Sequence, residues 1–200
     1  MIYVSLPVHE HPEVVIDQCL NFQKYLECLI VLHVPKAKDD LKSNVKELLA
    51  KNSLTQRVFI NPVSVDTGWG KIIGAHLSNI DFIIRNLKAK QKDKVVFHSS
   101  NDMLVKKGLT LYLSGKQFIF QERKFVNPGY WVPGKYALED DELRGFIVNT
   151  FSEFKGLCGS QLEGSMYSVE LLDMLRRSII KENLNLSIKY PVEEIIFSTF

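Results

Sequence analysis

Short apolar segments alternate with longer amphipathic ones through the first hundred residues, and this alternation restricts the fold more than any other feature of the sequence. Apolar, β-branched runs of this length are typical of strands, and apolar residues at intervals of three and four are typical of helices. The predicted strands are 2–8, 29–34, 57–60 and 94–98, and the predicted helices are 13–26, 39–51 and 72–90. Because such alternation gives parallel strands joined by right-handed crossovers, we predict an α/β, Rossmann-type fold with a mostly parallel sheet and helices on both faces.

The predicted strands also indicate where a ligand would bind. The carboxyl ends of parallel strands lie at one edge of the sheet, and open α/β sheets bind their ligands there. Polar segments follow three of the strands, at 9–11, 35–38 and 99–102. We expect the chemistry of the protein to lie at these segments.

The second half of the chain is less regular. The predicted helices are 140–154, 168–181 and 193–200, with an extended segment at 186–190. Residues 127–134 form a loop rich in turn residues and aromatics, and this loop contains Trp131. Two interpretations of the loop stay open. It covers a bound sugar by stacking an aromatic ring on it, or it is a structural loop with a buried tryptophan.

The charge balance and the apolar runs exclude several classes of partner. The chain has 25 Lys and Arg against 23 Asp and Glu, and the two signs are mixed along it, so we expect no nucleic-acid partner. No run approaches the roughly 18–20 apolar residues of a membrane-spanning helix, and no signal peptide is predicted. The 3 cysteines lack Cys-x-x-Cys spacing, which is typical of a reducing compartment. We predict a cytoplasmic protein with at most peripheral membrane association.

Motifs for several common chemistries are missing. The sequence contains no GxGxxG, no GxxxxGK[ST] and no GxSxG segment, so dinucleotide binding, a phosphate loop and a serine-hydrolase elbow are not supported. His9 and His11 flank a glutamate, but no third ligand stands at a recognisable spacing. A solvated loop is favoured there, and we predict no metal site.

Four segments resemble, in the same order, motifs of the core-2/I-branching glycosyltransferases, a family that includes protein xylosyltransferases. Residues 95–107 resemble its strand, turn and "DxPxKT" segment, and residues 65–71 resemble its small-Trp-Gly turn before a helix. Residues 159–172 resemble its "GS" strand and "SRE" helix start, and residues 190–199 resemble its "PDExxxxT" segment. The resemblance covers nearly the whole chain and implies a GT-A-like fold.

The resemblance implies inverting transfer of a sugar from a UDP-sugar donor to a hydroxyl of a glycan or glycolipid acceptor. It places the general base at Glu194. Together with the strand ends and the aromatic loop, it predicts two sets of binding residues. Those for the sugar nucleotide are Val8, His9, His33, Pro35, Trp69, Ser100 and Asp102. Those for the acceptor are Glu122, Arg123, Trp131, Gly159 and Ser160.

Glu194 has the residue type and the position that a general base needs. A carboxylate in the first turn of a helix gains about 0.3–1 kcal/mol from the helix dipole, so we expect it to stay ionised. A second interpretation stands beside this one, because paired glutamates such as Glu193 and Glu194 are common in a first helical turn after proline.

The sequence departs from the family at three points. Pro35 stands where the family has the aspartate of "HVD", and Leu104 stands where it has the proline of "DxP". The basic residues that neutralise the diphosphate follow the "PDE" helix in the family and cannot be matched here. No Asp-x-Asp follows the fourth predicted strand, so we predict that no metal is required. The local cations are Lys106, Lys107, Arg123 and Lys124.

Two other functions stay open. The chain is a non-catalytic nucleotide-sugar-binding or scaffold domain of a larger assembly, or it is a metal-dependent transferase of another family with Asp102 as a metal ligand. In each case we predict one domain over 1–200, with a nucleotide-sugar-binding half, 1–115, and an acceptor and catalytic half, 116–200. We expect the natural protein to continue beyond residue 200.

Overall fold

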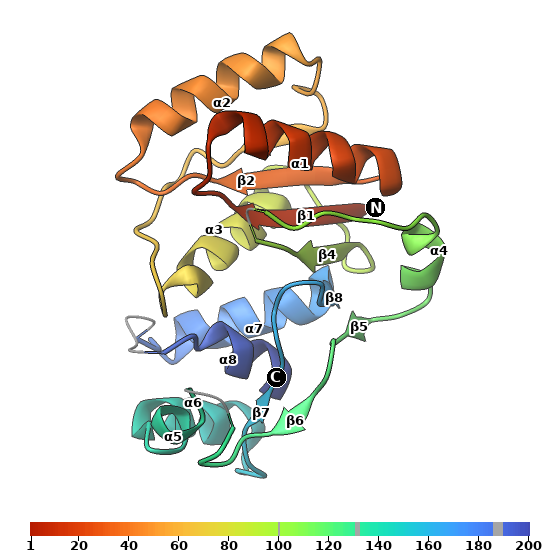
Figure 1. Cartoon of the computed structure of the whole chain (residues 1–200). Helices are drawn as coiled ribbons and strands as arrows, with labels where there is room; N and C mark the ends of the chain where they lie inside the picture. The colour runs from red at the N-terminus through yellow and green to blue at the C-terminus, as the bar shows by residue number, and fades with distance from the viewer. Residues whose placement is uncertain (100, 131–132, 186–189) are drawn as a thin grey trace.

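The computed structural model describes residues 1–99, 101–130, 133–185 and 190–200. Within these residues six strands form a central sheet in the order β3-β2-β1-β4-β8-β5, and β6 and β7 form a small second sheet (Figure 1). The strands are β1 (Ile2–Pro7), β2 (Leu29–His33), β3 (Val58–Ile60), β4 (Lys94–Phe97), β5 (Phe118–Ile119), β6 (Lys124–Phe125), β7 (Cys158–Gly159) and β8 (Met166–Ser168). The helices are α1 (Pro12–Tyr25), α2 (Asp39–Lys51), α3 (Ile72–Arg85), α4 (Leu109–Leu113), α5 (Pro133–Leu138), α6 (Asp141–Phe151), α7 (Val169–Lys181) and α8 (Glu193–Thr199).

Parallel pairing dominates the part of the sheet that the first half of the chain builds. β1 pairs in parallel with β2 and β4, and β2 pairs in parallel with β3. β8 pairs antiparallel with β4, and β5 pairs antiparallel with β8. The predicted α/β fold with a mostly parallel sheet is confirmed, and the second half of the chain extends this sheet with antiparallel strands.

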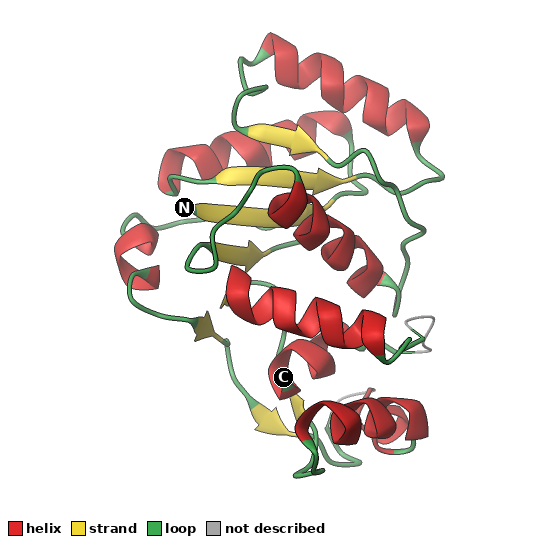
Figure 2. Ribbon diagram, turned by 180° about the vertical axis from the view of Figure 1, so that it is seen from behind, coloured by secondary structure: helices red, strands yellow, loops and turns green. Residues whose placement is uncertain are grey.

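Helices cover both faces of the sheet. α1 and α2 lie on one face, and α3 and α7 lie on the other (Figures 1 and 2). Val4 and Leu6 of β1 belong to the apolar cluster under α1 and α2, whereas Tyr3 belongs to the cluster that contains α3, α7 and α8. Because successive side chains of a strand point to opposite faces, a strand covered on both sides is mainly apolar along its length. This burial explains the continuous apolar runs of the sequence.

The prediction of a helix over 72–90 is wrong at its end, because α3 stops at Arg85. Lys88 has a left-handed backbone with φ of 54°, which a continuing helix does not allow. The amide of Ala89 then donates to the carbonyl of Ile83 over 3.2 Å. The chain therefore turns back toward β4 five residues earlier than the apolar spacing indicates.

The remaining differences lie in the irregular part of the chain. α4, α5, the strand β8 and the two-residue strands β5 and β6 were not predicted. The helix predicted for 140–154 ends at Phe151, where Ser152 has φ of 63°. The predicted extended segment 186–190 lies outside the described residues except for Tyr190.

No helix in the described ranges is both long enough and apolar enough to cross a membrane.

Candidate functional site

Hydrogen bonds to β7 and to the residue that follows it fix α8, which carries Glu194 in its first turn. The amide of Ser160 donates to the carbonyl of Glu194 over 3.0 Å. Near the other end of α8, the Thr199 hydroxyl accepts from the amide of Cys158 at 2.9 Å and donates to its carbonyl at 3.0 Å. The predicted helix after Pro191 is confirmed, and these bonds set the direction in which Glu194 points.

Glu194 lines an open cavity of about 650 Å³. Small-molecule sites have volumes of about 300–1,000 Å³. Most of the lining residues are of polar type, and they are Gln121, Glu122, Lys124, Asn127, Gly129, Tyr130, Gln161 and Glu194. Glu122, a predicted acceptor-binding residue, thus lies in the same cavity as the predicted base. Amide, carboxylate and phenol groups can all hydrogen-bond to a ligand rich in hydroxyl groups.

Burial raises the pKa of Glu194 to about 7, with a further upward contribution from the negative charge of Glu163. This outcome differs from the expectation that the helix dipole keeps the carboxylate fully ionised. α8 has only 7 residues, and desolvation outweighs its dipole. A carboxyl group that titrates near neutral pH can accept a proton and release it again, which suits a general base.

Glu193 is more deeply buried than its neighbour, at 5% exposure. Its Oε2 has no hydrogen-bond partner in the described part of the chain. Burial raises the pKa of Glu193 to about 7, and the charges of Glu194 and Glu163 add to the rise. Glu163 comes close because the amide of Gly164 donates to the carbonyl of Phe97 at 2.7 Å, which holds the β7–β8 loop at the end of β4.

Tyr130 lines the Glu194 cavity and packs directly on Gly159 of β7. A Cβ atom at Gly159 would overlap the hydroxyl and ring of Tyr130, so only glycine leaves room for this ring. Burial raises the pKa of Tyr130, and the charges of Glu194 and other nearby groups raise it further. The phenol therefore keeps its proton and can donate a hydrogen bond beside Glu194. Gly159, a predicted acceptor residue, takes part in this geometry through Tyr130.

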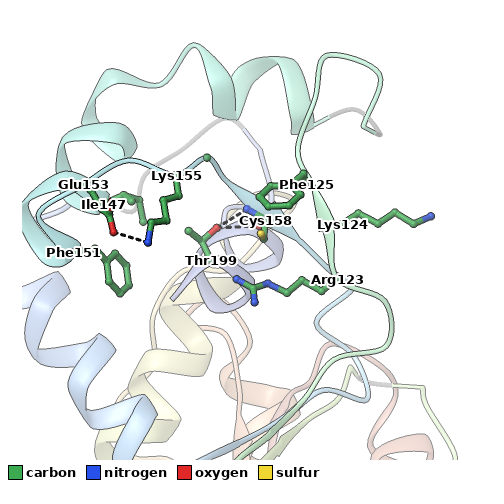
Figure 3. Close-up of a pocket in the computed structure, with 10 residues that line it drawn as sticks. Arg123, Lys124, Phe125, Ile147, Phe151, Glu153, Lys155, Cys158 and Thr199 are labelled. Carbon is green, nitrogen blue, oxygen red and sulfur yellow. Dashed lines mark hydrogen bonds and ion pairs between the residues drawn. The ribbon is translucent and has the colours of Figure 1, made fainter.

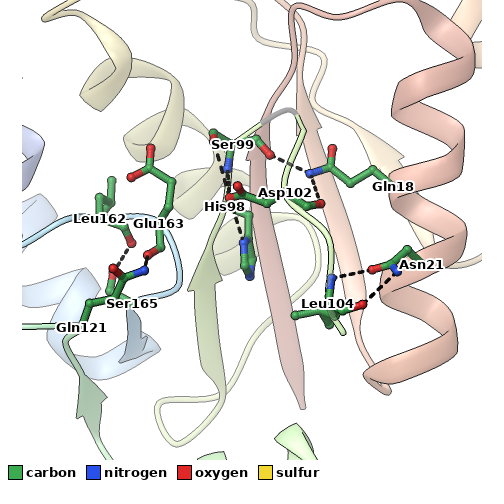
Figure 4. A network of polar contacts seen from close by, with 10 residues as sticks. All are labelled: Gln18, Asn21, His98, Ser99, Asp102, Leu104, Gln121, Leu162, Glu163 and Ser165. Carbon is green, nitrogen blue, oxygen red and sulfur yellow. Dashed lines mark hydrogen bonds and ion pairs between the residues drawn. The ribbon is translucent and has the colours of Figure 1, made fainter. Parts of the chain in front are cut away.

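Asp102, predicted to bind the donor, holds the turn that follows β4 (Figure 4). Its carboxylate accepts from Nδ1 of His98 and from the amide of Ser99, each at 3.1 Å. The hydrogen bond from His98 is the main cause that lowers the pKa of Asp102. The amide group of Gln18 on α1 donates to the carbonyls of Ser99 and Asp102 at 2.6 and 2.9 Å. The turn is therefore built into the fold at the carboxyl end of β4.

Two other predicted donor residues, Val8 and His33, have buried side chains with 1% and 0% exposure. The amide of Val8 donates to the carbonyl of His33 at 2.9 Å, and Nε2 of His33 lies 3.3 Å from the backbone of Val65. These residues join the loops after β1, β2 and β3. His9 is exposed, and its carbonyl accepts from Nζ of Lys38 at 3.1 Å.

The loop after β2 contains two cations that the sequence analysis did not single out. Lys36 and Lys38 line a cavity of about 460 Å³ at the start of α2, next to the predicted donor residue Pro35. Asp39 and Asp40 line the same cavity, so its two positive charges stand beside two negative ones. The sequence feature that could have identified these lysines is their position in a short segment between a predicted strand and a predicted helix.

The other predicted residues are dispersed. Trp69 is 66% exposed, and Ser160 is buried at 2% exposure. Arg123 does not line the Glu194 cavity but lines two others. Ser100 and Trp131 lie outside the described residues, so the predictions for them stay predictions.

Comparisons of the sequence with models of protein families and with curated proteins find no match. Within the described ranges, no group of three or more His, Cys, Asp or Glu side chains is arranged to hold a metal ion.

Proposed function

We propose that this protein is an inverting glycosyltransferase of GT-A-like fold that transfers a sugar from a UDP-sugar to a hydroxyl of a glycan or glycolipid. The observation that carries the proposal is the position of Glu194 in a cavity of about 650 Å³, together with a pKa that burial raises to about 7. A general base is most effective when its pKa lies near the working pH.

Glu194 takes the proton of the acceptor hydroxyl while the oxygen of that hydroxyl attacks the anomeric carbon. The bond from this carbon to the diphosphate breaks on the opposite face, which inverts the configuration. Tyr130 and Glu122 lie in the same cavity and orient the acceptor sugar by hydrogen bonds. Positioned general-base catalysis of this kind contributes about 10²–10⁴-fold to the rate.

The donor is assigned to the carboxyl ends of β1, β2 and β4. Open α/β sheets bind ligands at this edge, and the predicted residues His9, Pro35 and Asp102 follow these strands. Lys36 and Lys38 supply positive charge beside Pro35 and are our candidates to stabilise the departing diphosphate. With lysines in this role the transfer needs no metal, and the protein acts in the cytoplasm.

Turnover of a panel of UDP-sugars with glycan and glycolipid acceptors tests the proposal, using Glu194→Gln and the matched control Glu27→Gln, which lies on the exposed loop between α1 and β2. We expect kcat/KM to fall about 10²–10⁴-fold in Glu194→Gln and to stay unchanged in the control. In the wild type, kcat/KM should rise with pH up to about 7 and then level off, because the base must be deprotonated. Undiminished activity of Glu194→Gln would show that Glu194 is not the general base.

Two measurements separate the proposal from its alternatives. Loss of turnover on addition of chelator, restored by manganese, favours a metal-dependent transferase. Calorimetric binding of UDP without transfer to any acceptor favours a non-catalytic scaffold domain.

A further inference from the structure

A third cavity, of about 430 Å³, lies between α6, β6 and the end of α8 (Figure 3). Its walls are mostly apolar and include Phe125, Ile147 and Phe151. Phe125 is 70% exposed and Phe151 is 40% exposed, an unusual amount of aromatic surface to leave in water. The cavity therefore has the apolar lining and the size of a site for a ligand with an apolar part.

Arg123 joins this cavity to a smaller one. The smaller cavity, of about 100 Å³, is lined mainly by aromatic and aliphatic side chains of β5, α7 and α8, among them Phe118 and Leu171. Arg123 lines both cavities, so one guanidinium group borders two mainly apolar sites.

Arg123 is free to bind an anion. No carboxylate within the described ranges forms an ion pair with it, and its guanidinium carbon lies 5.6 Å from the centre of the Phe120 ring. Lys155 lines the larger cavity and pairs with Glu153 at 2.7 Å, but both side chains are exposed. Exposed pairs of this kind are weak, so Lys155 can change partner to a stronger anion. A guanidinium binds phosphate oxygens in a bidentate manner.

We propose that these two cavities bind a single phosphate-bearing lipid, with the phosphate at Arg123 and the alkyl chains against the phenylalanines. Lys124 lines both the larger of these cavities and the Glu194 cavity, so the two sites are neighbours. A lipid held at Arg123 can therefore present an attached sugar to Glu194. The lipid-linked sugar as acceptor rests on the proposed function, whereas lipid binding itself does not.

Isothermal calorimetry with monomeric dihexanoyl phosphatidic acid tests the proposal. The comparison ligands are inorganic phosphate, which lacks the chains, and dihexanoyl phosphatidylcholine, which lacks the net charge. We expect saturable binding of the phosphatidic acid, and binding at least tenfold weaker for both comparison ligands. Arg123→Gln and Phe151→Asp should each weaken phosphatidic acid binding at least tenfold. Arg57→Gln, on the exposed loop before β3, should not change it.

The proposal is overturned if Arg123→Gln binds as tightly as the wild type, if inorganic phosphate binds as tightly as phosphatidic acid, or if only anionic vesicles bind. The last result would assign the surface to a membrane. Circular dichroism spectra identical to the wild type establish that the variants are folded. Binding by Glu194→Gln with wild-type affinity is expected, so a failure of the proposed transfer leaves the lipid result standing.

Discussion

Two adjacent glutamates of α8 differ in what they do for the protein. Glu194 reaches a cavity, whereas Glu193 is 5% exposed and lines none of the three cavities described around α8. Burial of a carboxyl group favours its protonated form in the folded state. Glu193 therefore binds its proton more tightly in the folded protein than in the unfolded chain, and this difference makes stability depend on pH.

Glu193→Gln should stabilise the protein at high pH. The pKa of Glu193 is raised from 4.5 to about 7 on folding, so the wild type keeps its full stability below pH 4.5 and loses this contribution as pH rises through about 7. At 1.36 kcal/mol per unit, we expect the variant to gain about 3 kcal/mol at pH 8 and almost nothing at pH 4. Urea unfolding at both pH values measures this. Glu170→Gln, at an exposed position, is the control. An equal effect of Glu193→Gln at both pH values contradicts the argument.

Gly159 and Tyr130 should be energetically coupled. A methyl group at Gly159 overlaps the Tyr130 ring, so Gly159→Ala should destabilise the protein by about 2 kcal/mol. In a Tyr130→Ala background the methyl group has room, and the same change should have almost no effect. A double-mutant cycle from urea unfolding measures the coupling. Additive effects of the two changes would show that the ring and the glycine are independent.

The sequence predicted the place of Glu194 in a first helical turn, but not the state of its carboxyl group. The position follows from Tyr190-Pro191 and the acidic pair, which are local features. The pKa is raised first by burial and then by the charge of Glu163, which is 31 positions earlier in a loop that is hydrogen-bonded to the end of β4. Such long-range neighbours cannot be inferred from local spacing.

At the scale of elements, a buried polar network attaches α3 to the sheet. Asn79, with 0% exposure, donates to the carbonyl of Val31 at 3.0 Å and to the hydroxyl of Ser5 at 3.1 Å. Its own Oδ1 accepts from Asn61 at 3.0 Å. Nδ1 of His76 lies 2.9 Å from the same Ser5 hydroxyl, and burial lowers the pKa of His76 to about 3, so the ring is neutral. The network thus ties α3 to β1, to β2 and to the loop after β3.

Asn79→Ala should destabilise the protein by about 3 kcal/mol, because it leaves buried partners unsatisfied and opens a small cavity. Thermal and urea unfolding measure the loss. The control is Asn149→Ala, since Asn149 also donates a side-chain hydrogen bond, at 2.8 Å to Glu182, but on the exposed surface. A loss no larger than that of the control would mean that the network does not hold α3.

The elements of the first half were predicted better than the shortest elements of the second half. The strands of the parallel half and the helices α1, α2 and α7 carry enough apolar repeats for spacing to identify them. β5 and β6 have two residues each, and α4 has 5, so none contains a full period of either pattern. The early end of α3 depends on the backbone of Lys88, a residue type with no preference for left-handed φ.

At the scale of the whole molecule, the two halves of the chain share one sheet and one core. β8 from the second half lies between β4 and β5. α7 packs beside α3, and Arg176 donates to Asp81 at 3.0 Å across this contact with only 13% of its side chain exposed. Tyr3 and Val95 of the first half share an apolar cluster with Tyr167 and Ile195 of the second half. The sequence analysis divides the binding roles at residue 115, but this division does not separate two hydrophobic cores.

The protein should therefore unfold in one cooperative step, and residues 1–115 alone should not fold. Without β8 the edge of β4 has unpaired backbone groups, and without α7 and α8 the face of the parallel strands under α3 loses part of its apolar cover. We expect coincident urea transitions by near- and far-ultraviolet circular dichroism for the full chain. The 1–115 fragment should aggregate or show no cooperative transition, whereas the full chain carrying the exposed-surface change Asn149→Ala should behave as the wild type. Two separate transitions of the full chain, or a cooperative transition of the fragment, would show that the parallel half is stable without the strand and helices that complete it.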